Sequence, residues 1–443
     1  MSIKNCFLDN KLKIKNVEFF IVALYFIAIT AHQLGTGFDA FFVRGIFGVM
    51  VLTVLIVNKK FTISNIFKWS LVFWGFYFTS CIWAENVNDT LKYVNNAIQI
   101  VFIFLILPTI IKDKEDLNKI LKLLLISLFY TAIVILIRTP LSQWGIVRIG
   151  RCVGLHPNAI GIRMAIGVII SLFFCHEKFK ENNKKGSIKY IIFMIIGIIL
   201  VLFSGSRKAL ALTILGVVGF EVFNSTGKKR ILKIVSISII FIILLVLIFN
   251  NEQLYSVMGI RIERVVRTLI EGENVSENDR AGSLIERIFF IRQAIDLFRN
   301  NPLIGYGGNN FATWMRNIEY ENPVYSHNNF VELLSTLGIV GFAIYYFFFG
   351  KVLLGLLHNI KINKDDSYSI LFFTLMIMML ILDLGSISYA ADFNAIIFCF
   401  AYICVNLNKV NSNEINNKKN QLICNIKSLV KKIKIENINL IKR

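Results

Sequence analysis

The sequence has few charged residues for its length. Asp, Glu, Lys and Arg make up only 17% of the 443 residues, whereas 56% are hydrophobic and the mean hydropathy is +0.64. Soluble domains carry about 25% charged residues. The low charge therefore excludes an ordinary cytosolic enzyme. Because a membrane-spanning helix uses about 20 apolar residues, a dozen such helices would place about 240 residues in the bilayer.

Several common catalytic and metal-binding patterns are also missing. The seven cysteines include no C-x-x-C pair, so neither a disulfide framework nor a zinc ribbon is expected. No H-E-x-x-H or G-x-S-x-G motif occurs, so the sequence predicts no metal site, no cofactor and no serine nucleophile. The basic start is followed by an apolar run from Val17 without a small-residue cleavage site, which indicates an uncleaved first span.

Twelve apolar runs predict an all-α, polytopic membrane protein with about 12 transmembrane helices. The expected organisation is a membrane domain of nine spans over 1–250, a large helical loop over 251–326, three further spans over 327–406 and a basic tail over 407–443. The predicted spans are 17–35, 38–57, 66–84, 91–111, 117–138, 159–175, 189–204, 208–223, 232–250, 327–350, 369–387 and 389–406.

Lysine is distributed unevenly between the loops, and this distribution predicts the orientation. Lys and Arg near span ends favour the cytoplasm. The assignment that fits best puts both termini inside and leaves only Lys92 and Lys208, of 32 lysines, on the outer side. The 251–326 loop is then outside the cytoplasm and has no lysine. The basic tail is expected to lie on the anionic inner leaflet, and because it lacks interleaved aromatic residues, nucleic acid is not expected as a partner.

Arginine, unlike lysine, is frequent on the outer side. Ten Asp and Glu share the 251–326 loop, so most of these arginines are expected to form ion pairs at a wet surface. A guanidinium group is also the side chain best suited to bidentate binding of phosphate, so a few of them are expected to bind an anion. They are Arg261, Arg264, Arg267, Arg280, Arg287, Arg292, Arg299 and Arg316, and the preceding outer loop adds Arg148 and Arg151.

Three further segments attract attention. Residues 284–299 have the periodicity of an amphipathic helix that ends before Pro302, and the glycine-rich turn after it is either a phosphate-binding nest or, as we favour, a tight bend. Ser204 to Lys208 form a polar break between two apolar runs, where charge defaults to a functional role. His327 begins the tenth predicted span. Three roles are open for it: it takes a proton from an attacking hydroxyl, it binds a phosphate oxygen, or it is only the neighbour of Ser326, which caps the helix.

These residues occur in an order that resembles a known family. The motifs are His156-Pro157-Asn158 before the sixth span, Gly205-Ser206-Arg207 between two short spans, Arg287 followed by Asn301-Pro302-Leu303-Ile304-Gly305-Tyr306-Gly307, and Ser326-His327-Asn328 leading into Gly338 and Gly341. Together they resemble the bacterial O-antigen ligase and Wzy-type polysaccharide polymerase superfamily. The resemblance covers roughly residues 150–350 and leaves Arg163, inside the sixth span, without an explanation.

The resemblance implies an integral glycosyltransferase of the bacterial inner membrane that is inverting and independent of metal. Such an enzyme takes a glycan from undecaprenyl diphosphate at the outer leaflet and transfers it to a hydroxyl of an acceptor glycan. By analogy Arg207 and Arg287 would hold the diphosphate, and His327 would act as the base or as a phosphate ligand. Arg280 is a weaker second candidate, and His156 and Asn158 would contribute to substrate binding. A flippase and a chain-length regulator are the expected protein partners.

The sequence leaves alternative functions open. Polymerisation of repeat units and ligation to lipid A core share the same donor chemistry and differ in the acceptor, and we lean towards the polymerase. A 12-span transporter or flippase explains the span count equally well, but such proteins usually show two similar halves, and none are evident here. Glu252, Glu263 and Glu286 are further candidates for a base in the outer loop.

Overall fold

A computed structural model describes residues 3–31, 38–58, 60–151, 154–271, 284–318, 320 and 325–409. Within these ranges the chain forms helices and turns and no strand. The helices are α1 (Ile3–Ala31), α2 (Phe38–Asn58), α3 (Asn65–Thr79), η1 (Ser80–Ile82), α4 (Val87–Leu91), α5 (Val94–Ile110), α6 (Lys114–Arg138), η2 (Leu141–Gln143), α7 (Pro157–Lys180), α8 (Lys184–Phe203), α9 (Arg207–Phe223), α10 (Gly227–Asn250), α11 (Glu252–Leu254), the π-helix η4 (Tyr255–Gly259), α12 (Ile260–Glu271), α14 (Leu284–Asn300), α15 (Phe311–Asn317), α16 (Asn329–Ile362), α17 (Ser367–Asp383) and a helical segment over 392–409.

The all-helical membrane fold expected from the sequence is confirmed, although the number of spans is not. Each of the predicted apolar runs overlaps a helix. Within the described ranges, seven helical segments are long and apolar enough to cross a membrane: α2, α4 with α5, α6, α7, α8, α10 and α16. α17 is apolar but shorter. Twelve spans therefore stay a prediction, and the tail beyond residue 409 lies outside the described residues.

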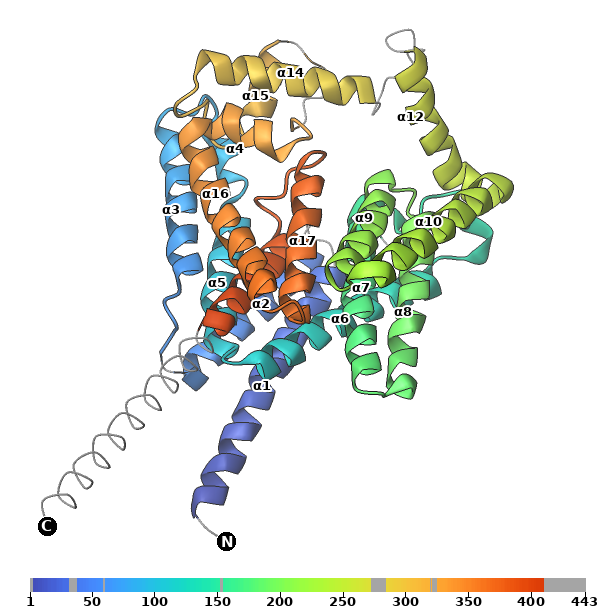
Figure 1. Ribbon diagram of the computed structural model, residues 1–443. Helices are drawn as coiled ribbons and strands as arrows, with labels where there is room; N and C mark the ends of the chain where they lie inside the picture. Colours follow the sequence, from blue (N-terminus) through green and yellow to red (C-terminus); the bar gives the residue numbers. More distant parts are fainter. Residues whose placement is uncertain are drawn as a thin grey trace, which may run out of the picture.

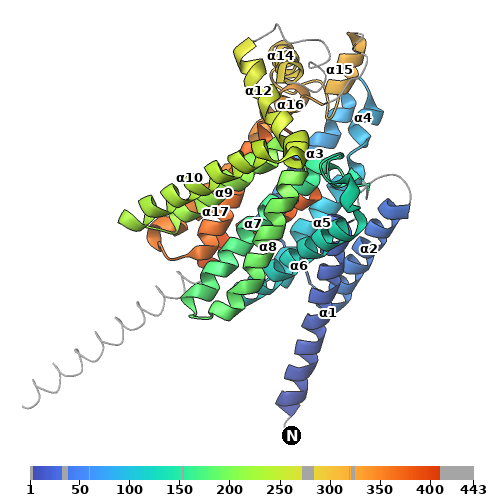
Figure 2. The ribbon, with the colours of Figure 1, turned by 90° about the vertical axis from the view of Figure 1, so that its right-hand side faces the viewer.

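The helices form a bundle with the predicted outer segments gathered at one end. In Figures 1 and 2, α12, α14, α15 and α4 lie at the top, whereas the start of α1 and the α7–α8 connection lie at the bottom. α7 packs along α8 and α9, and α1 packs along α6. We call the end that carries residues 139–151, 154–156, 204–206, 251–271 and 284–318 the loop end. The fold thus brings segments far apart in sequence to the same end of the bundle.

Helix α16 breaks at Gly338, and the chain before it fills the break. Gly338 has φ +64°, a conformation outside the helical region. At the break the amide of Ile339 donates to the carbonyl of Pro302 at 2.8 Å, and the amide of Val340 donates to that of Leu303 at 3.2 Å. A Cβ on Gly338 would lie 2.2 Å from the Leu303 oxygen. Only glycine allows both the backbone turn and this close approach.

The glycine-rich turn that follows α14 is held by the same break. The amide of Tyr306 donates to the Ser335 carbonyl at 3.1 Å, and the amide of Gly307 donates to the Thr336 carbonyl at 2.8 Å. The amide of Gly308 donates to the Ser80 hydroxyl at 2.8 Å. Because these amides bond within the protein, they are not available to a phosphate. The turn is a tight bend against α16, which is the interpretation that the sequence favoured.

Substitution of Gly338 tests this account of the α16 break. We expect Gly338→Ala to lower the thermal unfolding temperature of the purified protein. An L-residue at positive φ costs roughly 1–2 kcal/mol, and the contact with Leu303 adds to this cost. Gly350→Ala is the matched control, because Gly350 lies on the same helix, has no positive φ and has open space around its Cα. Equal unfolding temperatures for the two variants would contradict the account.

Candidate functional site

The outer helices have a small hydrophobic core of their own. Phe290, Ala294 and Leu297 on α14 pack against Phe311 and Met315 on α15, and all five side chains are buried. The start of α16 contributes a partly buried residue to this cluster. The helix predicted over 284–299 is present and buries one face here. The buried face is not the predicted stripe of Leu284, Ile288, Ile291, Ile295 and Phe298, since Ile288 is 40% exposed. α14 is held as a rigid element across the top of the bundle (Figure 1).

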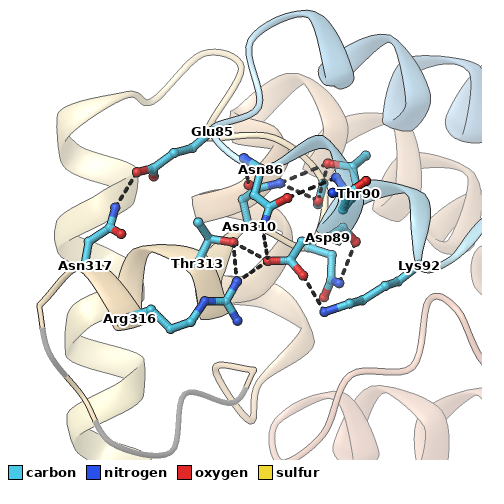
Figure 3. Close-up of polar contacts among 12 residues, drawn as sticks. Glu85, Asn86, Asp89, Thr90, Lys92, Asn310, Thr313, Arg316 and Asn317 are labelled. Carbon is cyan, nitrogen blue, oxygen red and sulfur yellow. Dashed lines mark hydrogen bonds and ion pairs between the residues drawn. The ribbon is translucent and has the colours of Figure 1, made fainter.

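A polar network fastens α15 to α4 (Figure 3). Asp89 accepts from the Thr313 hydroxyl and from the Arg316 guanidinium, and it also pairs with Lys92. Asn310 donates from Nδ2 to the Thr90 hydroxyl at 2.9 Å. Asp89 is 3% exposed, so loss of its partners would leave a buried carboxylate uncompensated. The network explains Arg316 as a structural arginine of the kind expected for most of the outer set.

The polar break after α8 is a tight turn that aims Arg207 at the outer helices. Gly205 has φ +58°, and Ser206 caps α9 by accepting from the Ala209 amide. A Cβ on Gly205 would lie 2.7 Å from the Val257 carbonyl oxygen, so the turn packs directly beneath η4. Arg207 begins α9 and donates from Nη1 to the Arg261 carbonyl at 3.0 Å. This bond connects the membrane bundle to α12.

The outer loop before α7 adds a second partly buried arginine next to this turn. Arg148 donates from Nε to the Ser204 carbonyl at 2.7 Å and from Nη2 to Oδ1 of Asn158 at 2.6 Å. Asn158, predicted as a substrate contact, thus holds an arginine. His156 caps α7 through its backbone only and is exposed. Burial first, and then the charges of Arg148, Arg151 and Lys208, lower the pKa of His156.

The arginines at the loop end are close enough to repel one another. Burial, together with the charges of Arg261, Arg151 and Arg207, lowers the pKa of Arg148 to about 10. The pKa of Arg261 is also lowered, first by burial and then by Arg264, Arg287 and Arg151. Such mutual depression marks a concentration of positive charge in a partly desolvated place. We call Arg148, Arg207, Arg261 and Arg287 the arginine cluster.

Neutral oxygen atoms, and not carboxylates, accept the side-chain hydrogen bonds of Arg148 and Arg207. Among the described residues, none of the four members of the arginine cluster forms an ion pair with Asp or Glu, whereas Arg267, Arg299 and Arg316 each do. The Nε atom of Arg261 is buried and has no hydrogen-bond partner within the described chain. A buried donor without an acceptor is costly. The arrangement is suited to an anion that supplies the missing oxygens.

His327 lies at the edge of the arginine cluster in an unusual backbone conformation. It has φ +60°, in the left-handed region. Its ring stacks on Phe290 of α14 with 5.7 Å between centroids and lies 4.3 Å from the ring of Tyr325. Nδ1 is buried without a hydrogen-bond partner within the described part of the chain. Strained residues of this kind are concentrated at functional sites.

The electrostatic surroundings keep the His327 imidazole neutral. Burial is the largest cause and the charges of Arg287 and Lys208 add to it, so that the pKa of His327 is lowered to about 4. Lys208 follows Arg207 on α9 and donates from Nζ to the Gly385 carbonyl, just after α17. Asn328 donates to the neighbouring Leu384 carbonyl at 3.4 Å. The end of α17 therefore anchors both the arginine turn and the histidine turn.

Two of the three acidic residues proposed as alternative bases, Glu263 and Glu286, have other partners. Glu263 accepts from the Tyr255 hydroxyl at 2.6 Å and from Arg267 at 2.7 Å. Glu286 accepts from the Tyr320 hydroxyl at 2.9 Å. Glu332, which sequence reasoning overlooked, is fully buried, accepts from the Ser326 amide at 2.9 Å and leaves Oε1 unpaired among the described residues. Through this bond to Ser326, Glu332 stabilises the turn that contains His327.

Three of the predicted site residues lie near one another. Arg287 is within electrostatic reach of both Arg207 and His327. Arg280 lies outside the described residues. Sequence reasoning named Arg148 and Arg261 only as members of the outer arginine set, and it named Lys208 only as part of the polar break and not as a site residue. The signal for Lys208 was its position, since it is one of two lysines on the predicted outer side.

Comparison with known proteins supports the family resemblance. Residues 192–346 match the family model described as O-antigen ligase. The match includes Arg207, Arg261, Arg287 and His327, and it ends just beyond the break in α16. No curated protein matches the chain with significant similarity.

Titration of His327 tests the electrostatics of this site. With isotopically labelled histidine and assignment by His327→Gln, NMR should show this imidazole neutral at pH 6 and protonated only near pH 4. Arg287→Gln should raise the pKa of His327, because one of the positive charges that oppose protonation is removed. Between about pH 6.5 and 4, the His327 imidazole is protonated in the unfolded chain but not in the folded chain. The free energy of unfolding therefore decreases as the pH falls through this range. A midpoint near 6.5 in the wild type would contradict the account.

Proposed function

We propose that this chain, whose residues 192–346 match the O-antigen ligase family, transfers a glycan from undecaprenyl diphosphate to an acceptor hydroxyl outside the cytoplasm. We further propose that it polymerises polysaccharide repeat units. The single observation that carries the proposal is the arginine cluster beside His327 at the loop end, where the described chain provides no carboxylate partner.

The charge and position of the cluster suit the diphosphate of a lipid-linked donor. Phosphate oxygens accept bidentate hydrogen bonds from guanidinium groups, and a partly buried setting strengthens such bonds. Arg207 begins a helix of the membrane bundle, whereas Arg261 and Arg287 come from the outer helices. A diphosphate between them would have its lipid in the bilayer and its glycan above the bundle. In this proposal Arg207 and Arg287 hold the diphosphate, and Arg148 and Arg261 supply further positive charge.

The proposed reaction has one bond-forming and one bond-breaking event. The acceptor oxygen forms a bond to the anomeric carbon while the bond from that carbon to the diphosphate oxygen breaks. Negative charge then grows on the leaving diphosphate, and the cluster stabilises it. Preorganised groups of this kind typically contribute more to rate enhancement than any other single effect. Attack on the face opposite the leaving group would invert the anomeric configuration.

His327 is proposed to position the acceptor hydroxyl and to take its proton as the new bond forms. A neutral imidazole has a nitrogen that can accept this hydrogen bond. The pKa of about 4 makes His327 a weak base in the free protein. A bound diphosphate would raise this pKa, because its negative charge offsets Arg287 and Lys208. Binding of the lipid-linked donor would thus make His327 a stronger base before the acceptor hydroxyl reacts.

The family description favours a second candidate function, ligation of the glycan to a separate acceptor. Its printed name is O-antigen ligase, and polymerase and ligase share the donor side of the site. The two differ in products. With purified protein and undecaprenyl diphosphate-linked oligosaccharide, a polymerase makes longer lipid-linked glycan, whereas a ligase releases lipid diphosphate only when a separate acceptor is added. Translocation of the intact donor without turnover would overturn both in favour of a transporter.

Arginine-to-lysine substitutions test the role of the cluster in turnover. We expect Arg287→Lys to lower kcat about 10²- to 10³-fold, because lysine keeps the charge but loses the planar fork. Release of lipid diphosphate and glycan length would be followed in the same reaction. Arg292→Lys is the matched control, since Arg292 lies on the same helix and is exposed. We expect the control to turn over like the wild type, and equal rates for the two variants would rule out the assigned role.

A further inference from the structure

A groove between α6 and α8 lies towards the end of the bundle opposite the candidate site. It has a volume of about 290 Å³ and is lined by residues of these two helices alone. Lys122 lies about two turns from the start of α6, and Lys189 lies about one and a half turns from the start of α8. Both helices start at the end opposite the loop end, since α6 runs into residues 139–156 and α8 into residues 204–206.

Each helix contributes a lysine followed by an apolar stripe. Leu125 and Phe129 follow Lys122 on one face of α6, and Phe193 follows Lys189 on one face of α8. The rings of Phe129 and Phe193 meet with 5.6 Å between centroids, which closes the far end of the groove. The groove is therefore positively charged at one end and apolar along its length.

The two lysines converge on one pair of aromatic rings. The Lys122 ammonium lies 5.6 Å from the centre of the Phe174 ring, and that of Lys189 lies 5.1 Å from the centre of the Tyr190 ring. Phe174 and Tyr190 stack with 5.2 Å between centroids. The stacked pair therefore places both charges at the same end of the groove.

Neighbouring lysines have carboxylate partners that these two lack. Lys119 pairs with Glu115 at 2.7 Å, and Lys178 pairs with Glu181 at 2.5 Å. Within the described residues, Lys122 and Lys189 form no ion pair with a carboxylate. Two such ammonium groups near the same ends of membrane-spanning helices attract an anionic headgroup. An anion at the mouth of the groove would compensate both ammonium groups.

We propose that this groove binds a phospholipid with an anionic headgroup. The phosphate lies between Lys122 and Lys189, and one acyl chain follows the apolar wall to Phe129 and Phe193. Basic pockets between membrane helices recognise anionic headgroups in this way. Free phosphate would use the lysines but not the wall. The proposal does not depend on the proposed function, because the groove uses other helices and the other end of the bundle.

Lipid retention by the purified full-length protein tests the proposal. Native mass spectrometry would compare phosphatidylglycerol with phosphatidylcholine of the same acyl chains. We expect about tenfold preferential retention of phosphatidylglycerol. The double variant Lys122→Gln with Lys189→Gln should lose the preference. The control double variant Lys119→Gln with Lys178→Gln removes the same charge from paired lysines and should keep it.

Further variants and a competitor separate the alternatives. Lys122→Arg with Lys189→Arg should keep the preference, and Ile126→Trp should abolish retention by filling the groove while both charges remain. Thermal unfolding would show whether each variant is folded. Equal retention of the two lipids, equal loss in both glutamine variants, or displacement of the lipid by millimolar inorganic phosphate would each overturn the proposal.

Discussion

The structure at the loop end depends on one constraint: it holds several positively charged arginine side chains close together without a carboxylate to neutralise them. Arg207 bonds to the Arg261 carbonyl, Arg148 bonds to the Ser204 carbonyl and the Asn158 amide oxygen, and none of these acceptors carries a charge. A carboxylate partner would stabilise each guanidinium but would also neutralise it. Neutral partners leave the positive charge of these arginines in place, so that they repel one another. In the proposed function, a bound diphosphate relieves this repulsion.

The rest of the fold supplies the rigidity that this arrangement needs. Backbone hydrogen bonds join the break in α16 to the turn after α14, and the Asp89 network connects α15 to α4. Phe290 then links the same outer helix to the ring of His327. Because Arg287 lies one turn before Phe290 on α14, the packing of this helix sets the position of both the arginine and the histidine. On α14, the residue that packs in the core, Phe290, is therefore only three positions from the proposed site residue, Arg287.

Sequence reasoning succeeded where a property depends on local composition. Apolar runs located the helices, and the lysine-free, arginine-rich segment over 251–326 pointed to the end where the cluster lies. It could not find the break at Gly338, because an apolar run reads as continuous whether or not the backbone bends. It could not foresee the bond between Asn158 and Arg148, since a contact between residues ten positions apart depends on how the loop closes. The low pKa of His327 likewise arises from burial and from charges on other helices.

The most direct test of the central claim is the affinity of the purified protein for undecaprenyl diphosphate without a glycan. The account predicts binding that Arg207→Gln weakens at least about tenfold, since a charged hydrogen bond contributes about 1.5–3 kcal/mol. Arg299→Gln should leave the affinity unchanged, because Arg299 is exposed and paired with Asp296. Equal affinity of the Arg207→Gln variant and the wild type would show that the cluster does not hold the diphosphate.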